Sequence, residues 1–280
     1  MKTGTPPRYS FVTGDGLTLR YEIDDFTPPW STPETVLLLH AAMGSSRRFH
    51  HWVPGLAGRY RVVRWDMRGH GSSDRPPPEG LGIDRLAQDL LDFMDHLGLE
   101  RAHVVGSSTG GIIAMRAALE HSARFASLAS YMAIPGLAPS VTHVDYDAWK
   151  KGLVQEGVHA FLLRTAAQRF HLDQVDPGFV DWFCRESSRN DPGFLADFVR
   201  MMTGFDFSDR LGDITCPCLF VVASGDPVHS MENYAVLRRT PDHRFVVFDN
   251  MPHNVTDAVP ERCLAELVPF LDAVRQRARP

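Results

Sequence analysis

Residues 104–113 read VVGSSTGGII, a pair of serines enclosed by glycines and then by apolar residues. The apolar run at Ala102–Gly106 predicts a buried strand, and Ile112–Glu120 has the apolar spacing of a helix. The junction, Gly106–Gly110, fits the pattern G-x-S-x-G, in which a serine occupies a sharp strand-to-helix turn. A glycine-rich turn with a capping serine is the alternative, but the strand and helix on either side favour Ser108 as a nucleophile.

Strand-like and helix-like stretches alternate on both sides of this junction. Phe11–Ile23 predicts a hairpin that turns at Gly14–Gly16. Ile83–Leu97 and Leu264–Gln276 have the apolar spacing of helices. The alternation predicts an α/β fold with a mostly parallel, eight-stranded sheet and helices on both of its faces. The other predicted strands are Thr35–His40, Arg61–Asp66, Leu128–Ala133, Cys218–Ala223 and Arg244–Asp249.

The alternation stops in the second half of the chain, where residues 136–212 contain helical patterns and no convincing strand. We expect helices over Phe161–Phe170, Phe179–Glu186 and Phe194–Phe205. Asp176-Pro177 and Asp191-Pro192 are typical helix starts, with a capping aspartate before a proline. The prediction is a core domain (1–135 and 213–280) with a helical lid (136–212) inserted after the sixth strand. Such a lid would cover the carboxyl ends of the strands, where ligands of α/β sheets bind.

A serine nucleophile needs a base, and the base needs an orienting acid. Asp226 directly follows the strand Cys218–Ala223, and His253 follows the last strand. Each residue alone could be a turn cap or a loop residue. Their order, each just after a predicted strand, favours a triad of Ser108, Asp226 and His253. Asp249 and Asp257 are rival acids, but both lie too close to His253 in the sequence.

The loop after Thr35–His40 and the residue after the nucleophile are the expected sources of oxyanion donors. We expect the backbone N–H groups of Ala42 and Thr109 to fill this role, and His40 to be structural. Arg47 and Arg48 could meet a substrate carboxylate, although two adjacent arginines are more often solvated. The expected substrate-binding residues are Met43, Trp149, Phe161, Trp182, Met201 and Phe205. Phe179, Phe183 and Met202 could also line the pocket, although most of these bulky residues are expected to pack the lid onto the core.

The composition excludes several classes of protein. The 280 residues are 44% hydrophobic and carry a net charge of −5, so we expect no nucleic-acid partner. No apolar run is long enough to cross a membrane, and the first sixteen residues lack the apolar core of a signal peptide. The four cysteines have no zinc-site spacing, which suggests reduced thiols in a cytoplasmic protein. We expect neither a metal nor a cofactor.

Several segments together make the chain similar to the α/β-hydrolase superfamily. They are LLLHAAMGSS, RVVRWDMRGHGSSDRP, AHVVGSSTGGIIA, CPCLFVVASGDPV and DNMPHNVTDAVPERC. Within the superfamily the chain most resembles the 3-oxoadipate enol-lactonase-like and small carboxylesterase members. It departs from the usual pattern at Ala41, where glycine is common, and at Ser107, where histidine is common. Ser108 argues against a haloalkane dehalogenase, and Asn254 argues against a carbon–carbon bond hydrolase, which often has tryptophan there.

These residues predict a serine hydrolase that cleaves a small ester or lactone through an acyl-enzyme intermediate. A carbon–carbon bond or amide hydrolase could use the same triad. A cofactor-free oxygenase, or a ligand receptor that turns over slowly, would keep the fold without sustained hydrolysis. The expected partner is a small-molecule substrate.

Overall fold

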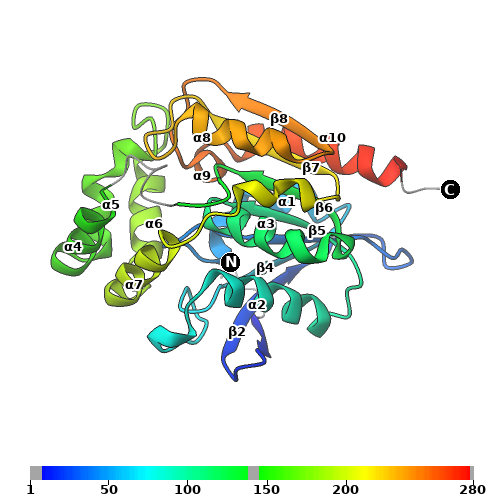
Figure 1. Cartoon of the computed structure of the whole chain (residues 1–280), viewed down its shortest axis with the longest axis horizontal. Helices are drawn as coiled ribbons and strands as arrows, with labels where there is room; N and C mark the ends of the chain where they lie inside the picture. The colour runs from blue at the N-terminus through cyan, green and yellow to red at the C-terminus, as the bar shows by residue number, and fades with distance from the viewer. Residues whose placement is uncertain (1–7, 138–144, 278–280) are drawn as a thin grey trace, which may run out of the picture.

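The computed structural model describes residues 8–137 and 145–277, which form one sheet of eight strands flanked by helices (Figure 1). The strand order is β1-β2-β4-β3-β5-β6-β7-β8. The pairs β1–β2 and β2–β4 are antiparallel, and all other neighbours are parallel. The predicted α/β fold with a mostly parallel sheet is confirmed. The strands are β1 (Arg8–Val12), β2 (Thr18–Asp24), β3 (Thr35–Leu39), β4 (Arg61–Trp65), β5 (Ala102–Ser107), β6 (Phe125–Tyr131), β7 (Cys218–Ala223) and β8 (His243–Phe248).

The first two strands form the hairpin predicted over Phe11–Ile23. The N–H of Thr13 donates to the carbonyl of Leu17 across the turn (2.9 Å), and Gly16 has a φ of 87°. A positive φ of this size suits glycine, which has no Cβ to collide with the backbone. Because β2 also pairs with β4, the hairpin extends one edge of the parallel sheet.

Strand β6 begins at Phe125, earlier than the start predicted at Leu128. The polar Ser127 interrupts the apolar run, yet it is fully buried in the structure. Its hydroxyl lies 2.8 Å from Nδ1 of His103 on the neighbouring strand β5. A buried hydrogen-bonded pair of this kind satisfies both polar groups, so the strand continues although the apolar pattern does not.

Helices cover both faces of the sheet. On one face α3 packs on β5 and β6 with α2 beside it, and on the other face α10 packs against β6 and β7 with α1 and α9 nearby. Helix α2 shows why these helices form, since Leu86, Leu90 and Phe93 lie on one side of it and are buried. The helices outside the β6–β7 connection are α1 (Val53–Leu56), α2 (Ile83–His96), α3 (Thr109–His121), α8 (Met231–Ala235), α9 (Val255–Ala258) and α10 (Pro260–Arg277).

Four further helices lie between β6 and β7 and gather at one end of the sheet, shown in green to yellow-green in Figure 1. We call residues 145–202 the cap segment. Asp176 and Asp191 accept hydrogen bonds from backbone N–H groups in the first turns of α6 and α7, as their position before proline predicted. The helices are α4 (Tyr146–Glu156), α5 (Val158–Arg164), α6 (Pro177–Ser187) and α7 (Pro192–Met202). Residues 138–144 of the predicted lid lie outside the described residues.

The helix predicted over Phe161–Phe170 is wrong in its extent. Helix α5 ends at Arg164, and a short 3-10 turn follows over Ala166–Gln168. The Thr165 hydroxyl donates to the carbonyl of Phe161 (2.7 Å). The structure also contains α4, whose start the sequence did not indicate.

All four cysteines are buried free thiols. Among the helices of residues 8–137 and 145–277, none is long and apolar enough to span a membrane. The same described residues contain no group of three or more histidine, cysteine, aspartate or glutamate side chains placed to hold a metal ion.

Candidate active site

Ser108 occupies a strained turn between β5 and α3. Its φ is 47° and its ψ is −113°, a combination that few residues other than glycine adopt. Its own N–H donates to the carbonyl of Tyr131 on β6 (2.7 Å), which fixes the turn against the sheet. The carbonyl of Ser108 accepts the first backbone hydrogen bonds of α3, from Gly111 and Ile112. The hydroxyl therefore stands at the carboxyl end of the central strands, beside a helix N-terminus.

Two glycines allow the strand and the helix to approach this closely. A Cβ at Gly106 would lie 2.3 Å from the backbone carbon of Gly110. A Cβ at Gly110 would lie 2.2 Å from the carbonyl oxygen of Leu39 on β3. Both neighbours are backbone atoms, which cannot turn aside as a side chain can. The spacing of glycines around Ser108 is therefore a packing requirement of the turn.

The structure brings Ser108, His253 and Asp226 into one hydrogen-bonded chain. Nε2 of His253 lies 3.1 Å from Oγ of Ser108, and Nδ1 of His253 lies 2.9 Å from Oδ2 of Asp226. Asp226 follows β7, and His253 lies between β8 and α9. Since parallel strands end at one edge of the sheet, residues far apart in the sequence meet there. The rival acid Asp257 pairs instead with Arg48 (2.7 Å), and Asp249 is exposed.

Asp226 is held as a carboxylate by three donors. Besides His253, the N–H of Val228 donates to its Oδ1 (2.8 Å), and the hydroxyl of Tyr234 donates to its Oδ2. Burial opposes ionisation of this carboxyl, but the neighbouring His253 ring and the hydrogen bonds outweigh it and lower the pKa of Asp226. Tyr234 is fully buried, and no sequence pattern marked it. An ionised carboxylate at this position can orient the imidazole and stabilise its protonated form.

Two backbone segments lie beside the serine, the loop after β3 and the first turn of α3. Ala42 and Thr109 line the same cavity as Ser108. Met43 has a positive φ of 62°, and the N–H of Gly44 donates to the carbonyl of Ala41 (3.1 Å), so the loop is tightly bent. Thr109 is the first residue of α3, where backbone N–H groups lack partners within the helix. An oxyanion near Ser108 would face this helix end.

His40 supports the loop from below. It is fully buried, its Nε2 accepts from the N–H of Met67 (3.0 Å), and its Nδ1 therefore carries the proton that it donates to the carbonyl of Ala41 (2.8 Å). Burial lowers the pKa of His40 to about 4, which keeps the ring neutral. This arrangement agrees with the structural role expected for His40.

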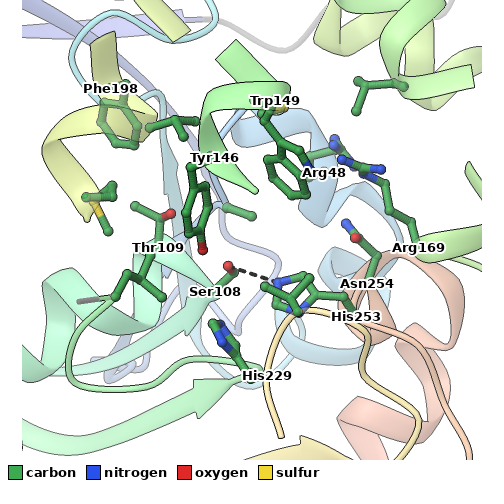
Figure 2. Close-up of a pocket in the computed structure, with 18 of the residues that line it drawn as sticks. Arg48, Ser108, Thr109, Tyr146, Trp149, Arg169, Phe198, His229, His253 and Asn254 are labelled. Carbon is green, nitrogen blue, oxygen red and sulfur yellow. Dashed lines mark hydrogen bonds between the residues drawn. The ribbon is translucent and has the colours of Figure 1, made fainter. Parts of the chain in front are cut away.

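The cavity above Ser108 has a volume of about 90 Å³. Tyr146 points from α4 toward Ser108, and Trp149 lies on the same side of the cavity (Figure 2). Of the expected substrate-binding residues, Met43 and Trp149 line this cavity. The lining also includes residues that the sequence did not single out, namely Leu137, Tyr146, Leu162, Arg169, Phe198, Val199, Val228 and His229.

Four of the expected substrate-binding residues lie elsewhere. Phe161 is buried beneath Trp149, with which it makes an edge contact at 5.8 Å. Trp182 lies on the other side of α6 and lines a separate surface cavity. Met201 is turned away by the helix rotation that brings its neighbour Met202 into the cavity. Phe205 follows the end of α7, and its ring stacks on the ring of Phe207.

Arg48 is buried, whereas two adjacent arginines were expected to be solvated. Its side chain is only 6% exposed and forms an ion pair with Asp257. Its Cζ lies 3.4 Å from the centroid of the Phe183 ring, and Phe183 and Arg48 both line the cavity. Arg47, the adjacent arginine, is exposed and pairs with Glu186 of the cap segment (3.3 Å). The two adjacent arginines thus differ in exposure and in ion-pair partner.

Two further buried residues, Ser107 and His229, lie beside the triad. Ser107 donates to or accepts from Thr256 (2.8 Å), which joins the strand-to-helix turn to α9. His229 is buried, and its ring lies edge-on to that of His253 at 5.6 Å. Burial, followed by the nearby His253, lowers the pKa of His229 to about 3, so this ring is neutral.

The chain is similar to known proteins over most of its length. Residues 34–257 match a family model described as the alpha/beta hydrolase fold. A Caulobacter segnis protein named as a carbamate hydrolase, RutD, is 28% identical over 85% of this chain and 91% of its own length. A 3-oxoadipate enol-lactonase of Acinetobacter baylyi is 29% identical over 63% of this chain and 65% of its own. The solved structure of an enol-lactonase from Burkholderia xenovorans LB400 has a TM-score of 0.85 at 21% identity, with 94% of this chain and 100% of that chain covered.

Proposed function

This chain belongs to the α/β-hydrolase family and is an enzyme of that family, and from this premise we propose that it is a serine hydrolase that cleaves a small ester or lactone. The observation that carries the proposal is the chain of hydrogen bonds from Asp226 through His253 to Ser108. A serine hydroxyl is a weak nucleophile until a base removes its proton, and this arrangement supplies both the base and the group that orients it.

In the proposed mechanism Oγ of Ser108 attacks the substrate carbonyl while Nε2 of His253 accepts its proton. The Asp226 carboxylate stabilises the imidazolium that forms. The N–H groups of Ala42 and Thr109 bind the developing oxyanion. The imidazolium then protonates the leaving oxygen, which leaves an acyl group on Ser108. Water, deprotonated by the same imidazole, hydrolyses the acyl-enzyme and restores the hydroxyl.

The cavity supports a small substrate. Its volume of about 90 Å³ is well below the roughly 300 Å³ at which pockets for drug-sized ligands begin. The names of two relatives, an enol-lactonase and a carbamate hydrolase, support an ester, lactone or carbamate carbonyl as the reacting group. The free thiols support our further proposal that the enzyme works in the cytoplasm, where thiols stay reduced.

The test compares three proteins on a panel of short-chain esters, lactones and carbamates: wild type, Ser108→Ala and Ser107→Ala. Loss of Ser108 should lower kcat by at least about a thousandfold, because triad members act as a unit. The matched control removes the neighbouring hydroxyl, which bonds to Thr256, and should retain activity within about tenfold. Turnover that survives Ser108→Ala would contradict the mechanism and favour base chemistry by the His–Asp pair. Tight binding of a panel compound without turnover would favour a receptor.

A further inference from the structure

One wall of the active-site cavity carries a buried arginine that the proposed mechanism does not use. Arg169 follows the short 3-10 turn after α5, is 7% exposed and lines the cavity. Its Nη1 donates to the carbonyl and the hydroxyl of Thr165, at 3.0 and 2.6 Å. Its Nε and Nη2 have no hydrogen-bond partner among residues 8–137 and 145–277. At least two of its donor groups therefore remain for a further acceptor.

Arg169 also lacks a counter-ion. None of the carboxylates in the described parts of the chain forms an ion pair with it. The aromatic faces of Trp149 and Phe161 lie 5.3 and 5.7 Å from its Cζ, which compensates its charge only in part. Burial, and then repulsion from Arg48, lower the pKa of Arg169 to about 10, so the side chain is still charged at neutral pH. A buried cation without an anion is costly, and an anionic ligand would remove that cost.

The other polar residues of this wall, Arg48 and Asn254, add no negative charge that would cancel Arg169. The charge of Arg48 is matched by Asp257, to which Asn254 also donates from its Nδ2 (3.1 Å). Figure 2 shows Arg48, Arg169 and Asn254 on the same side of the cavity as His253, whereas Phe198 lies on the opposite side. The cavity therefore has one cationic side and one apolar side, with Ser108 between them.

We propose that Arg169 forms a carboxylate-binding subsite, and that the preferred substrates are small esters or lactones with a carboxylate elsewhere in the molecule. The claim that the bound molecule is a substrate rests on the proposed hydrolase function, whereas the subsite itself requires only that a carboxylate binds. The free guanidinium nitrogens of Arg169 donate to the carboxylate. The scissile carbonyl then lies over Ser108, and the apolar part of the substrate faces Phe198 and Met202.

A purely structural role for Arg169 is the competing explanation. Its bonds to Thr165 close the end of α5, and its contacts with aromatic rings anchor the cap segment. Such a role would affect folding stability and all substrates alike. The carboxylate-binding role predicts instead a change in discrimination between acidic and neutral substrates, so the two roles have different readouts.

The experiment measures kcat/KM for two substrate pairs. In the first pair the acid is on the acyl side, monoethyl succinate against ethyl butyrate. In the second it is on the leaving-group side, 4-acetoxybenzoate against phenyl acetate. The ratio of acidic to neutral ester is compared between wild type and Arg169→Met, so that differences in intrinsic reactivity cancel. We expect the ratio to fall about 10- to 100-fold in at least one pair, the factor for a hydrogen bond between charged groups.

Two further variants separate binding from folding. Arg169→Lys keeps the charge and should retain part of the ratio that Arg169→Met loses. Arg164→Met removes an exposed arginine of the same cap segment, which pairs with Glu156, and should leave the ratio unchanged. A ratio that is unchanged in Arg169→Met for both pairs, or that falls equally in Arg164→Met, would overturn the proposal.

Calorimetric titration with succinate distinguishes failure of the subsite from failure of the hydrolase proposal. The Ser108→Ala variant should bind succinate, and the Ser108→Ala/Arg169→Met double variant should bind it at least about tenfold more weakly. This result without any Ser108-dependent turnover would retain the subsite and reject the proposed reaction. Equal succinate affinity in the two variants would overturn the subsite, whatever the turnover.

Discussion

Replacement of Gly110 by alanine tests whether the strained turn at Ser108 depends on close backbone packing. The added Cβ would lie 2.2 Å from the carbonyl oxygen of Leu39. This separation is about 1.2 Å shorter than the 3.4 Å at which ordinary contact begins. Because the opposing atom belongs to the backbone of β3, relief requires movement of the strand or of α3.

The expected cost follows from two opposing terms. Overpacking of a core by one carbon destabilises by about 1–3 kcal/mol, and a backbone obstacle places this substitution at the upper end. Alanine in a helix gains up to about 1 kcal/mol over glycine, which offsets part of that cost. We therefore expect Gly110→Ala to lower the free energy of unfolding by about 2 kcal/mol. Gly58→Ala, where a Cβ would meet nothing within 4 Å, should change it by less than about 0.5 kcal/mol.

Urea unfolding followed by circular dichroism measures both variants against wild type. Ester turnover by the fraction that is still folded adds a second readout, since Leu39 leads into the loop that carries Ala42. A shift of that loop by about 1 Å should lower kcat by about a hundredfold. Equal stability of Gly110→Ala and Gly58→Ala would refute the packing argument, and full activity in Gly110→Ala would refute its link to catalysis.

Three other perturbations have definite expected results. Arg48→Met leaves the buried carboxylate of Asp257 unpaired and should destabilise the fold by about 3–5 kcal/mol in urea unfolding; a loss below about 1 kcal/mol would disagree. Met202→Ala enlarges the cavity and should raise kcat/KM for longer acyl chains relative to acetate, whereas the control Met201→Ala should not. Because folding lowers the pKa of Asp226, its ionised carboxylate stabilises the fold at pH values above the unfolded-state pKa of about 3.9. This contribution disappears as the pH falls through the folded-state pKa. The stability difference between wild type and Asp226→Asn should therefore shrink below pH 4, and a constant difference from neutral pH to pH 3 would be inconsistent with this sign.

The chemical core of the site could be predicted from the sequence because it depends on strand ends. Ser108, Asp226 and His253 each follow an apolar run, and a parallel sheet brings such positions together whatever the cap segment does. The capping aspartates before Pro177 and Pro192 were predictable for a similar reason, since their hydrogen bonds are local.

The cavity wall could not be predicted, because it depends on how helices are rotated and docked. One residue of offset on α7 decides that Met202 and not Met201 enters the cavity. Arg48 is buried against Asp257 and Phe183, which are both far away in the sequence. Tyr234 donates to Asp226 from a helix that no motif connects with the triad. Side-chain partners of this kind are set by tertiary packing and leave no periodic pattern.

The central claim is that Ser108 is the nucleophile activated by His253, and covalent labelling tests it most directly. An alkyl fluorophosphonate reacts with an activated serine and leaves a stable phosphonyl adduct that peptide mass spectrometry can locate. We predict one adduct on Ser108 of the wild-type protein, slower labelling in His253→Ala and none in Ser108→Ala. Labelling of another residue, or sustained ester turnover by a protein whose Ser108 is never labelled, would contradict the account.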